Sequence, residues 1–199
     1  MALTGACRRG DQFHQADRRK VYGLDVAHSG FGALAGRPAD LTLGVQVRHD
    51  SIDRVALSLS SARQDYLAVR SDKVAQSSVG LFGEAQVQWH DKFRSIVGVR
   101  SDHYHFDVGS SLAQNSGRVR DQITSPKLAL ILGPWAKTEY YANLGFGFHS
   151  NDARGTTTRL NPDSRDPGYL SPVRPVTPLV RARGYELGVR SAIVPGLHS

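Results

Sequence analysis

Apolar side chains alternate with small or polar side chains along residues 140–150, "YYANLGFGFHS". Tyr140, Leu144, Phe146 and Phe148 fall on one parity, whereas Asn143 and His149 fall on the other. A period of two is that of a β-strand, whose successive side chains point to opposite faces. The segment therefore predicts a strand with one apolar face and one small or polar face. Such a strand fits a sheet that covers a protein core, and it also fits a barrel wall between lipid and water.

Six further segments show the same alternation, and no segment has a helical period. The clearest is residues 41–50, where Leu41, Leu43 and Val45 oppose polar or small neighbours, and the poorest is residues 93–108. The remaining four predicted strands cover residues 21–29, 78–90, 125–133 and 181–194. The pattern predicts an all-β fold, an antiparallel up-and-down meander of about seven strands.

The predicted connections alternate between short turns and long polar loops. Short turns are expected near residues 35–40, 90–93 and 133–139, whereas the long connections are expected at residues 50–76, 109–122 and 151–180. The first long connection has room for extensions of the two strands that flank it. In a meander, this alternation places all the short turns at one end, as in outer-membrane barrels. Trp89 and Trp135 flank short turns, where an aromatic girdle of such a barrel lies.

The composition of the chain excludes several classes of protein as candidates. Among 199 residues, no run reaches the roughly 18 to 20 apolar residues of a membrane helix. The net charge of +7 comes from 25 scattered Lys and Arg residues without a recognition motif, so no nucleic-acid partner is expected. The lone Cys7 excludes an internal disulfide and a cysteine zinc site. Residues 1–10 are an unassigned leader without a secretion signal, so export requires a signal that this chain does not show.

The segment "FHSNDARG" collects polar side chains at the end of a predicted strand. A hydrolytic site is one interpretation, because Ser150 and His149 are a nucleophile and a base that Asn151 or Asp152 could orient. Adjacent strand residues point in opposite directions, however, and no nucleophile elbow is present. The other interpretation is a strand end that enters an extracellular loop and contacts a ligand.

Two other polar sets lie on predicted strands. His103, His105 and Asp107 share one strand face at a spacing that suits a transition metal, or they form a hydrated rim. A ladder of polar side chains on residues 84–88, next to Arg100 and Asp102, would face a barrel lumen or satisfy polar groups across strands. We predict no catalytic residue, no metal ligand and no cofactor. The side chains predicted to face the lumen or a ligand are Glu84, Gln86, Arg100, Asp102, Asn143, His149, Asn151, Asp152 and Arg154.

Three stretches resemble a known family. "NLGFGFHSNDARG", "RARGYELGVRS" and the long stretch that begins "DQFHQADRRKVYGLDVAHS" are similar to the barrel wall of TonB-dependent outer-membrane receptors, over about residues 11–197. The resemblance implies a plug domain inside a barrel of about 22 strands. It also implies uptake of a scarce ligand, such as a metal chelate (siderophore) or cobalamin, with energy delivered through TonB.

The chain departs from this family in length and in its end. Seven strands are about a third of such a barrel, no plug domain is visible, and "VPGLHS" is not the expected terminal aromatic strand. We therefore expect residues 11–199 to be a partial barrel wall in the outer membrane of a Gram-negative cell. Its expected partners are outer-membrane lipid, the missing plug and strands, TonB through the parent receptor, and an unknown small ligand.

The sequence predicts a receptor fragment that is not an enzyme and does not transport alone. The alternatives are a soluble β-barrel or sandwich that binds a ligand, and an outer-membrane hydrolase. Ligand identity does not follow from the sequence, because specificity depends on the loops and on the plug.

Overall fold

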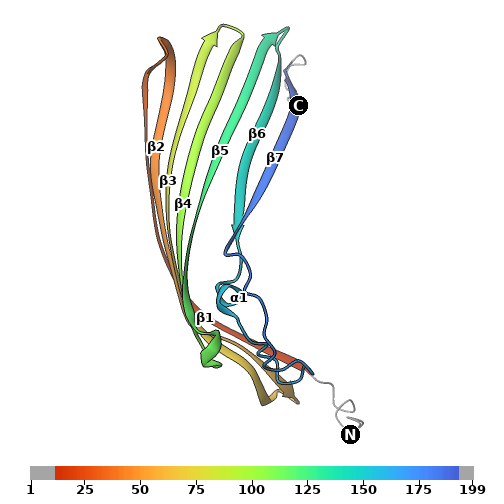
Figure 1. Ribbon diagram of the computed structural model, residues 1–199. Helices are drawn as coiled ribbons and strands as arrows, with labels where there is room; N and C mark the ends of the chain where they lie inside the picture. The colour runs from red at the N-terminus through yellow and green to blue at the C-terminus, as the bar shows by residue number, and fades with distance from the viewer. Residues whose placement is uncertain (1–11, 193–199) are drawn as a thin grey trace.

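The computed structural model describes residues 12–192, and these form one antiparallel sheet whose seven strands are hydrogen-bonded in sequence order (Figure 1). The predicted all-β meander is confirmed. The strands are β1 (Gln12–Leu34), β2 (Arg37–Ser61), β3 (Gln64–His90), β4 (Phe93–Ser110), β5 (Gly117–Trp135), β6 (Thr138–Ser150) and β7 (Leu179–Ser191). The predicted leader with Cys7 and the segment "VPGLHS" lie outside the described residues. No helix within residues 12–192 has the length and apolarity that crossing a membrane requires.

A long loop at residues 50–76 is wrong, and the strand extensions that the sequence allows there fill nearly all of it, because β2 and β3 continue as one hairpin. The hairpin closes in a two-residue turn, Ala62–Arg63, with φ of 52° and 67°. Ala136–Lys137 turns in the same way, with φ of 45° and 62°. Two successive left-handed residues match the twist of the flanking strands. Asn-Gly or Asp-Gly is the usual signature of this turn, and Ala62–Arg63 lacks it, so the sequence did not mark the turn.

The other two predicted loops have different outcomes. Most of residues 109–122 extends β4 and β5, and only residues 111–116 connect them, through the 3₁₀ turn η2 (Ala113–Asn115). Residues 151–178 do form a long connection, which contains the short helix α1 (Ala153–Thr157). Five residues are too few for a helical period to show in the sequence. Of the three long connections that the sequence predicts, only the one between β6 and β7 is long in the structure.

The two ends of the sheet differ. The turns at residues 35–36, 91–92 and 136–137 lie together at the upper end in Figure 1, here called the turn end. The helix α1 and the connection between β6 and β7 lie at the opposite end, here called the loop end.

The two faces of the sheet differ in polarity. Cross-strand partners point to the same side, so Val47 opposite Val79 and Leu41 opposite Ala85 define an outer, apolar face. From Leu41 to Val47 this apolar belt covers about 20 Å of strand, at roughly 3.3 Å per residue. Its side chains are exposed, and they include Leu24, Val26, Leu41, Leu43, Val47, Val79, Leu81, Val97, Val99, Leu128, Leu132, Tyr140, Leu144, Leu187 and Val189.

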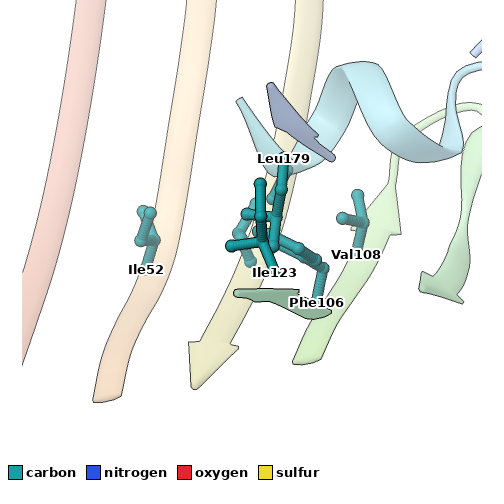
Figure 2. Packing of buried hydrophobic residues seen from close by; sticks show 7 residues of the cluster. Ile52, Phe106, Val108, Ile123 and Leu179 are labelled. Carbon is teal, nitrogen blue, oxygen red and sulfur yellow. The ribbon is translucent and has the colours of Figure 1, made fainter. Parts of the chain in front are cut away.

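The buried core lies on the other, inner face and at the loop end. Ile52, Val74, Phe106 and Val108 from β2, β3 and β4 pack with Ile123 of β5 (Figure 2). The same cluster includes Ala153 of α1 and Leu179 of β7. This core therefore holds the connection between β6 and β7 against the inner face.

The strand β6 leaves β5 near its middle. The last cross-strand pair between them is Lys127 opposite Gly145. Beyond that point Phe148 turns to the core and stands edge-on to Tyr104, with 5.8 Å between the ring centroids. Phe148 and Tyr140 therefore share a parity in the sequence but lie in different environments. Phe148 packs against the buried core, whereas Tyr140 is half exposed on the outer face.

Candidate functional site

A chain of hydrogen bonds crosses the inner face from β1 to β4. Gln46 Nε2 donates to Asp25 at 3.0 Å, while Gln46 Oε1 accepts from Arg100 Nη2 at 2.8 Å. Arg100 Nε in turn donates to both carboxylate oxygens of Asp102, at 2.8 and 3.0 Å. Asp102 is 1% exposed, so its charge depends on this guanidinium. The structure therefore brings the predicted Arg100 and Asp102 together, and it adds Gln46 and Asp25.

Glycines make room for these side chains. At Gly80, opposite Gln46, an added Cβ would lie 2.3 Å from Arg100 Nη2. At Gly98 it would lie 2.7 Å from Lys127 Cε. The two glycines therefore leave space through which long polar side chains of other strands reach across the sheet.

The other predicted ladder residues lie on the same inner face. Glu84 of β3 forms an ion pair with Lys127 of β5, and Gly98 stands between them on β4. Asn143 Nδ2 donates to Glu186 on β7 at 3.1 Å. Gln86 lines a small hollow near the turn end and makes no hydrogen bond through its side chain among the described residues. These polar groups cover the inner face from β3 to β7.

A hollow of about 470 Å³ lies on the inner face where β6 departs from β5. Its lining combines aromatic rings with charged groups: Asp25, Phe82, Glu84, Val99, Arg100, Ser125, Lys127, Phe146 and Phe148. Ser125 Oγ is buried and has no hydrogen-bond partner among the described residues. The hollow therefore offers aromatic rings and charged side chains to an occupant.

A second hollow, of about 370 Å³, lies at the loop end and is lined mainly by polar groups. The predicted residues Asn151, Asp152 and Arg154 line it from the start of the long connection. No local sequence pattern marks the opposite wall, which is made by Asp17, Arg19, Arg48 and Asp50. Asp17 and Arg19 are distant in the sequence from Arg48 and Asp50, and only the pairing of β1 with β2 brings the two pairs together.

Ion pairs set the electrostatics of this loop-end hollow. Arg48 donates two hydrogen bonds to Asp50, at 2.8 and 3.0 Å, and Arg19 donates to Asp17 at 3.0 Å. Arg154 pairs with Asp152, which also accepts the backbone N–H of Arg154 as the N-cap of α1. Burial raises the pKa of Asp152, but the hydrogen bonds and charge of Arg154 outweigh it, so the net pKa lies below the ordinary value.

The remaining candidate residues do not form a reactive centre. His149 and Ser150 pair with Val180 and Leu179 on β7, and no hydrogen bond joins their side chains in the described part of the chain. His105 accepts from Arg120 Nε at 3.3 Å, and Asp107 accepts from Arg118 at 2.7 Å. Residues 12–192 contain no group of three or more His, Cys, Asp or Glu side chains that could hold a metal ion.

An antiparallel meander with an exposed apolar belt outside and ion-paired polar groups inside has the build of a transmembrane β-barrel wall. The chain belongs to the TonB-dependent receptor family. The family model described as "TonB dependent receptor-like, beta-barrel" matches residues 3–197, so the predicted family is confirmed.

Three solved structures illustrate the shared fold. The unliganded ferric citrate transporter FecA is 14% identical over 91% of this chain, with a TM-score of 0.68. The ferric yersiniabactin uptake receptor FyuA from Yersinia pestis is 13% identical over 92% of the chain (TM-score 0.61), and the copper transporter OprC is 16% identical over 89% (TM-score 0.59). The chain spans 26%, 27% and 28% of their lengths, about a quarter. No curated protein sequence matches the chain. These relatives are named as transporters or receptors rather than enzymes.

Proposed function

We propose that this chain forms part of the wall of an outer-membrane transporter that imports a scarce ligand with energy delivered through TonB. Its outer face contacts lipid, and its inner face lines the ligand path and supports a plug domain. The observation that carries the proposal is the apolar belt, in which Leu187 is 82% exposed and Leu43 is 69% exposed. A water-soluble protein rarely exposes so large a contiguous apolar surface, whereas lipid removes that cost.

The loop-end hollow is the proposed ligand contact. It combines arginine and aspartate side chains from β1, β2 and the long connection, with Arg48 and Arg154 on opposite walls. A ligand carboxylate or hydroxamate group can take the place of Asp50 or Asp152 on these guanidinium groups. The three similar structures are those of a ferric citrate transporter, a ferric yersiniabactin uptake receptor and a copper transporter. A metal chelate (siderophore) is therefore the proposed ligand class, and cobalamin is the second.

The proposed wall is completed by further strands and a plug, and this chain alone is not proposed to transport. The test expresses the chain with an export signal, separates the membranes, and measures heat-modifiable gel migration and circular dichroism in detergent. We expect outer-membrane association and β-structure that requires detergent or the co-expressed remainder of a barrel. A soluble monomer that melts cooperatively without detergent would overturn the proposal and favour a soluble ligand-binding module.

A further inference from the structure

The strands β5 and β6 meet along a seam that is closed toward the turn end and open toward the loop end. The last ladder pair is Lys127 opposite Gly145, and beyond it no pair joins the two strands among residues 12–192. Residues 146–183, here called the arm, comprise the end of β6, the long connection and the start of β7. The arm lies over the inner face, where Phe148 packs against the buried core (Figure 1).

The unpaired backbone groups of β5 point into the open part of the seam. Between β4 and β5, the N–H of Gly133 donates to the carbonyl oxygen of Lys92 at 2.9 Å. Bonding residues alternate along an antiparallel strand, so the odd-numbered residues of β5 bond to β4. The even-numbered residues of β5, among them Thr124 and Gln122, therefore direct their N–H and C=O groups toward β6.

The unpaired groups of β6 point the opposite way, toward β5. The N–H of Ala192 donates to the carbonyl oxygen of Lys137 at 3.0 Å, so the odd-numbered residues of β6 bond to β7. The even-numbered residues, among them Phe146 and Phe148, direct their groups toward β5. If the register of the closed ladder continued, the free groups of the two edges would meet in bonding pairs.

Side chains replace part of this missing ladder on β5. Arg181 Nη1 of the arm donates to the carbonyl oxygen of Thr124 at 2.7 Å. Asp121 accepts the N–H of Gln122 at 2.8 Å and the N–H of Leu179, in the arm, at 3.3 Å. The bonds at Thr124 and Gln122 use groups that pairing with β6 would otherwise use. The same contacts therefore hold the arm in its present position and keep the seam open.

Pro126 and two glycines lie where the seam opens. Pro126 is the next even-numbered residue after Leu128, so the N–H that it lacks is one that would bond to Phe146. Gly145 and Gly184 stand opposite one another on β6 and β7, and a Cβ added at Gly184 would have nothing within 4 Å. A closed seam would thus lack one ladder bond at its start, and both strands of the arm can bend there without moving a side chain.

The sequence of β6 suits a second position of the arm. Phe146 and Phe148 have the parity of Tyr140 and Leu144, which lie on the outer face. If the arm were paired with β5, both rings would extend that face directly beyond the apolar belt, where aromatic side chains of barrels concentrate. In the present position both rings line the hollow of about 470 Å³. The two phenylalanines therefore have a suitable environment in either position.

We propose that the arm is a gate with two positions: seated on the inner face, as in this structure, or paired with β5 so that the seam is closed. The gate regulates the hollow, because Phe146, Gly147 and Phe148 line it only while the arm is seated. An occupant that contacts these residues favours the seated position, since a ligand shifts an equilibrium toward the state that it binds. The proposal rests on the proposed function in one respect, which is that the hollow lies on a ligand path.

Disulfide formation measures the closed seam in the full chain, folded in dodecyl maltoside with Cys7→Ser as background. The reporter pair is Gln122→Cys with Ser150→Cys, which a continued register would place opposite one another. They are now apart, because Gln122 lies on the outer face of β5 and Ser150 lines the loop-end hollow. The matched control, Leu130→Cys with Ala142→Cys, is already a bonding pair of the same ladder. Cα atoms of such pairs lie about 5.5 Å apart, which a disulfide spans.

Oxidation with copper phenanthroline is expected to link the control pair first and the reporter pair more slowly, but to completion. Pro126→Ala restores the missing donor and is expected to speed the reporter about fivefold, the effect of one hydrogen bond, without changing the control. Arg181→Ala removes a bond of the seated arm and is expected to act in the same direction. Circular dichroism checks that each variant folds.

Two outcomes would overturn the gate. One is the absence of a disulfide in the reporter pair with Pro126→Ala after the control pair is fully oxidised. The other is a reporter pair that oxidises as fast as the control without that substitution, because the seam would then be closed already. Both outcomes leave the proposed function standing, whereas a chain that folds without detergent rejects the proposed function.

Discussion

Glu84 on β3 and Lys127 on β5 form an ion pair across the strand that separates them. The pair exists because Gly98, the β4 residue between them, has no side chain. An added Cβ would lie 2.7 Å from Lys127 Cε and 3.2 Å from Cγ. A small residue on one strand thus decides a contact between its two neighbours.

Gly98→Ala is expected to displace Lys127 and break its contact with Glu84. Because both charges are partly exposed, the loss in the free energy of unfolding is expected to be about 1 kcal/mol. Urea titration in detergent, followed by circular dichroism, measures it. Gly109→Ala on the same strand is the control, since nothing lies within 4 Å of its added Cβ. Equal effects of the two substitutions would contradict the role assigned to Gly98.

Arg100→Gln is expected to lower the free energy of unfolding by about 2 to 3 kcal/mol. The substitution leaves the buried carboxylate of Asp102 without its guanidinium partner. Adding Asp102→Asn removes that charge and is expected to restore at least 1 kcal/mol. The double-mutant cycle uses the same urea titration. Strict additivity of the two single effects would show that the residues do not interact.

Leu43→Arg and Thr42→Arg test the assignment of the two faces. These neighbours lie on opposite faces of β2, with Leu43 exposed in the apolar belt. In a lipid bilayer Leu43→Arg is expected to cost about 2 to 4 kcal/mol, whereas Thr42→Arg is expected to cost less than about 1 kcal/mol. Unfolding in phospholipid vesicles measures both. A larger cost for Thr42→Arg would reverse the assignment of lipid-facing and lumen-facing sides.

Asn115→Ala is expected to release the connection between β6 and β7. The fully buried Asn115 side chain accepts the N–H groups of Arg159 and Leu160, at 2.8 and 2.9 Å, and donates to the Leu160 carbonyl. Loss of these bonds is expected to cost about 2 to 3 kcal/mol and to speed tryptic cleavage at Arg159 at least tenfold. The exposed neighbour Gln114→Ala serves as the control. Unchanged cleavage in the Asn115 variant would exclude this role.

Order in the same connection is expected to weaken at low pH. The pKa of Asp152 is lower in the folded chain than in the unfolded chain, so its contribution is present above the unfolded pKa, about 4. The contribution is lost as the pH falls through the folded pKa. Because the side chain is about half exposed, the change is expected to stay below about 1 kcal/mol. Hydrogen exchange at residues 153–157, corrected for intrinsic rates, measures it between pH 5 and pH 2. Asp152→Asn is expected to remove most of this pH dependence.

The sequence predicted the strands and the two faces because both depend on a local period of two. Leu41, Leu43, Val45 and Val47 are an example, since their parity alone assigns them to one side. The sequence missed the hairpin turn at Ala62–Arg63, where neither residue has the usual turn chemistry. It also missed Asp17 and Arg48 in the loop-end hollow, because strand register, rather than spacing, brings them together.

The departure of β6 from β5 shows a further limit. Alternation predicted that Phe148 and Tyr140 face the same surroundings, but the pairing ends at Gly145 and Phe148 packs on Tyr104. Where a strand parts from its neighbour depends on the packing at the loop end, which no local pattern encodes. Only the strand pairing in the structure shows that the two rings lie in different environments.

In the described part of the chain, β1 and β7 each hydrogen-bond to a neighbour on one side only. Every second residue of each strand therefore presents an N–H and a C=O group to the surroundings, and hydrocarbon offers them no partner. Satisfying these groups in a membrane requires a further polypeptide edge on each side, and where a separate molecule supplies that edge, folding and association become a single thermodynamic event. The measured stability of the sheet is then a function of protein concentration, as it is for an obligate oligomer.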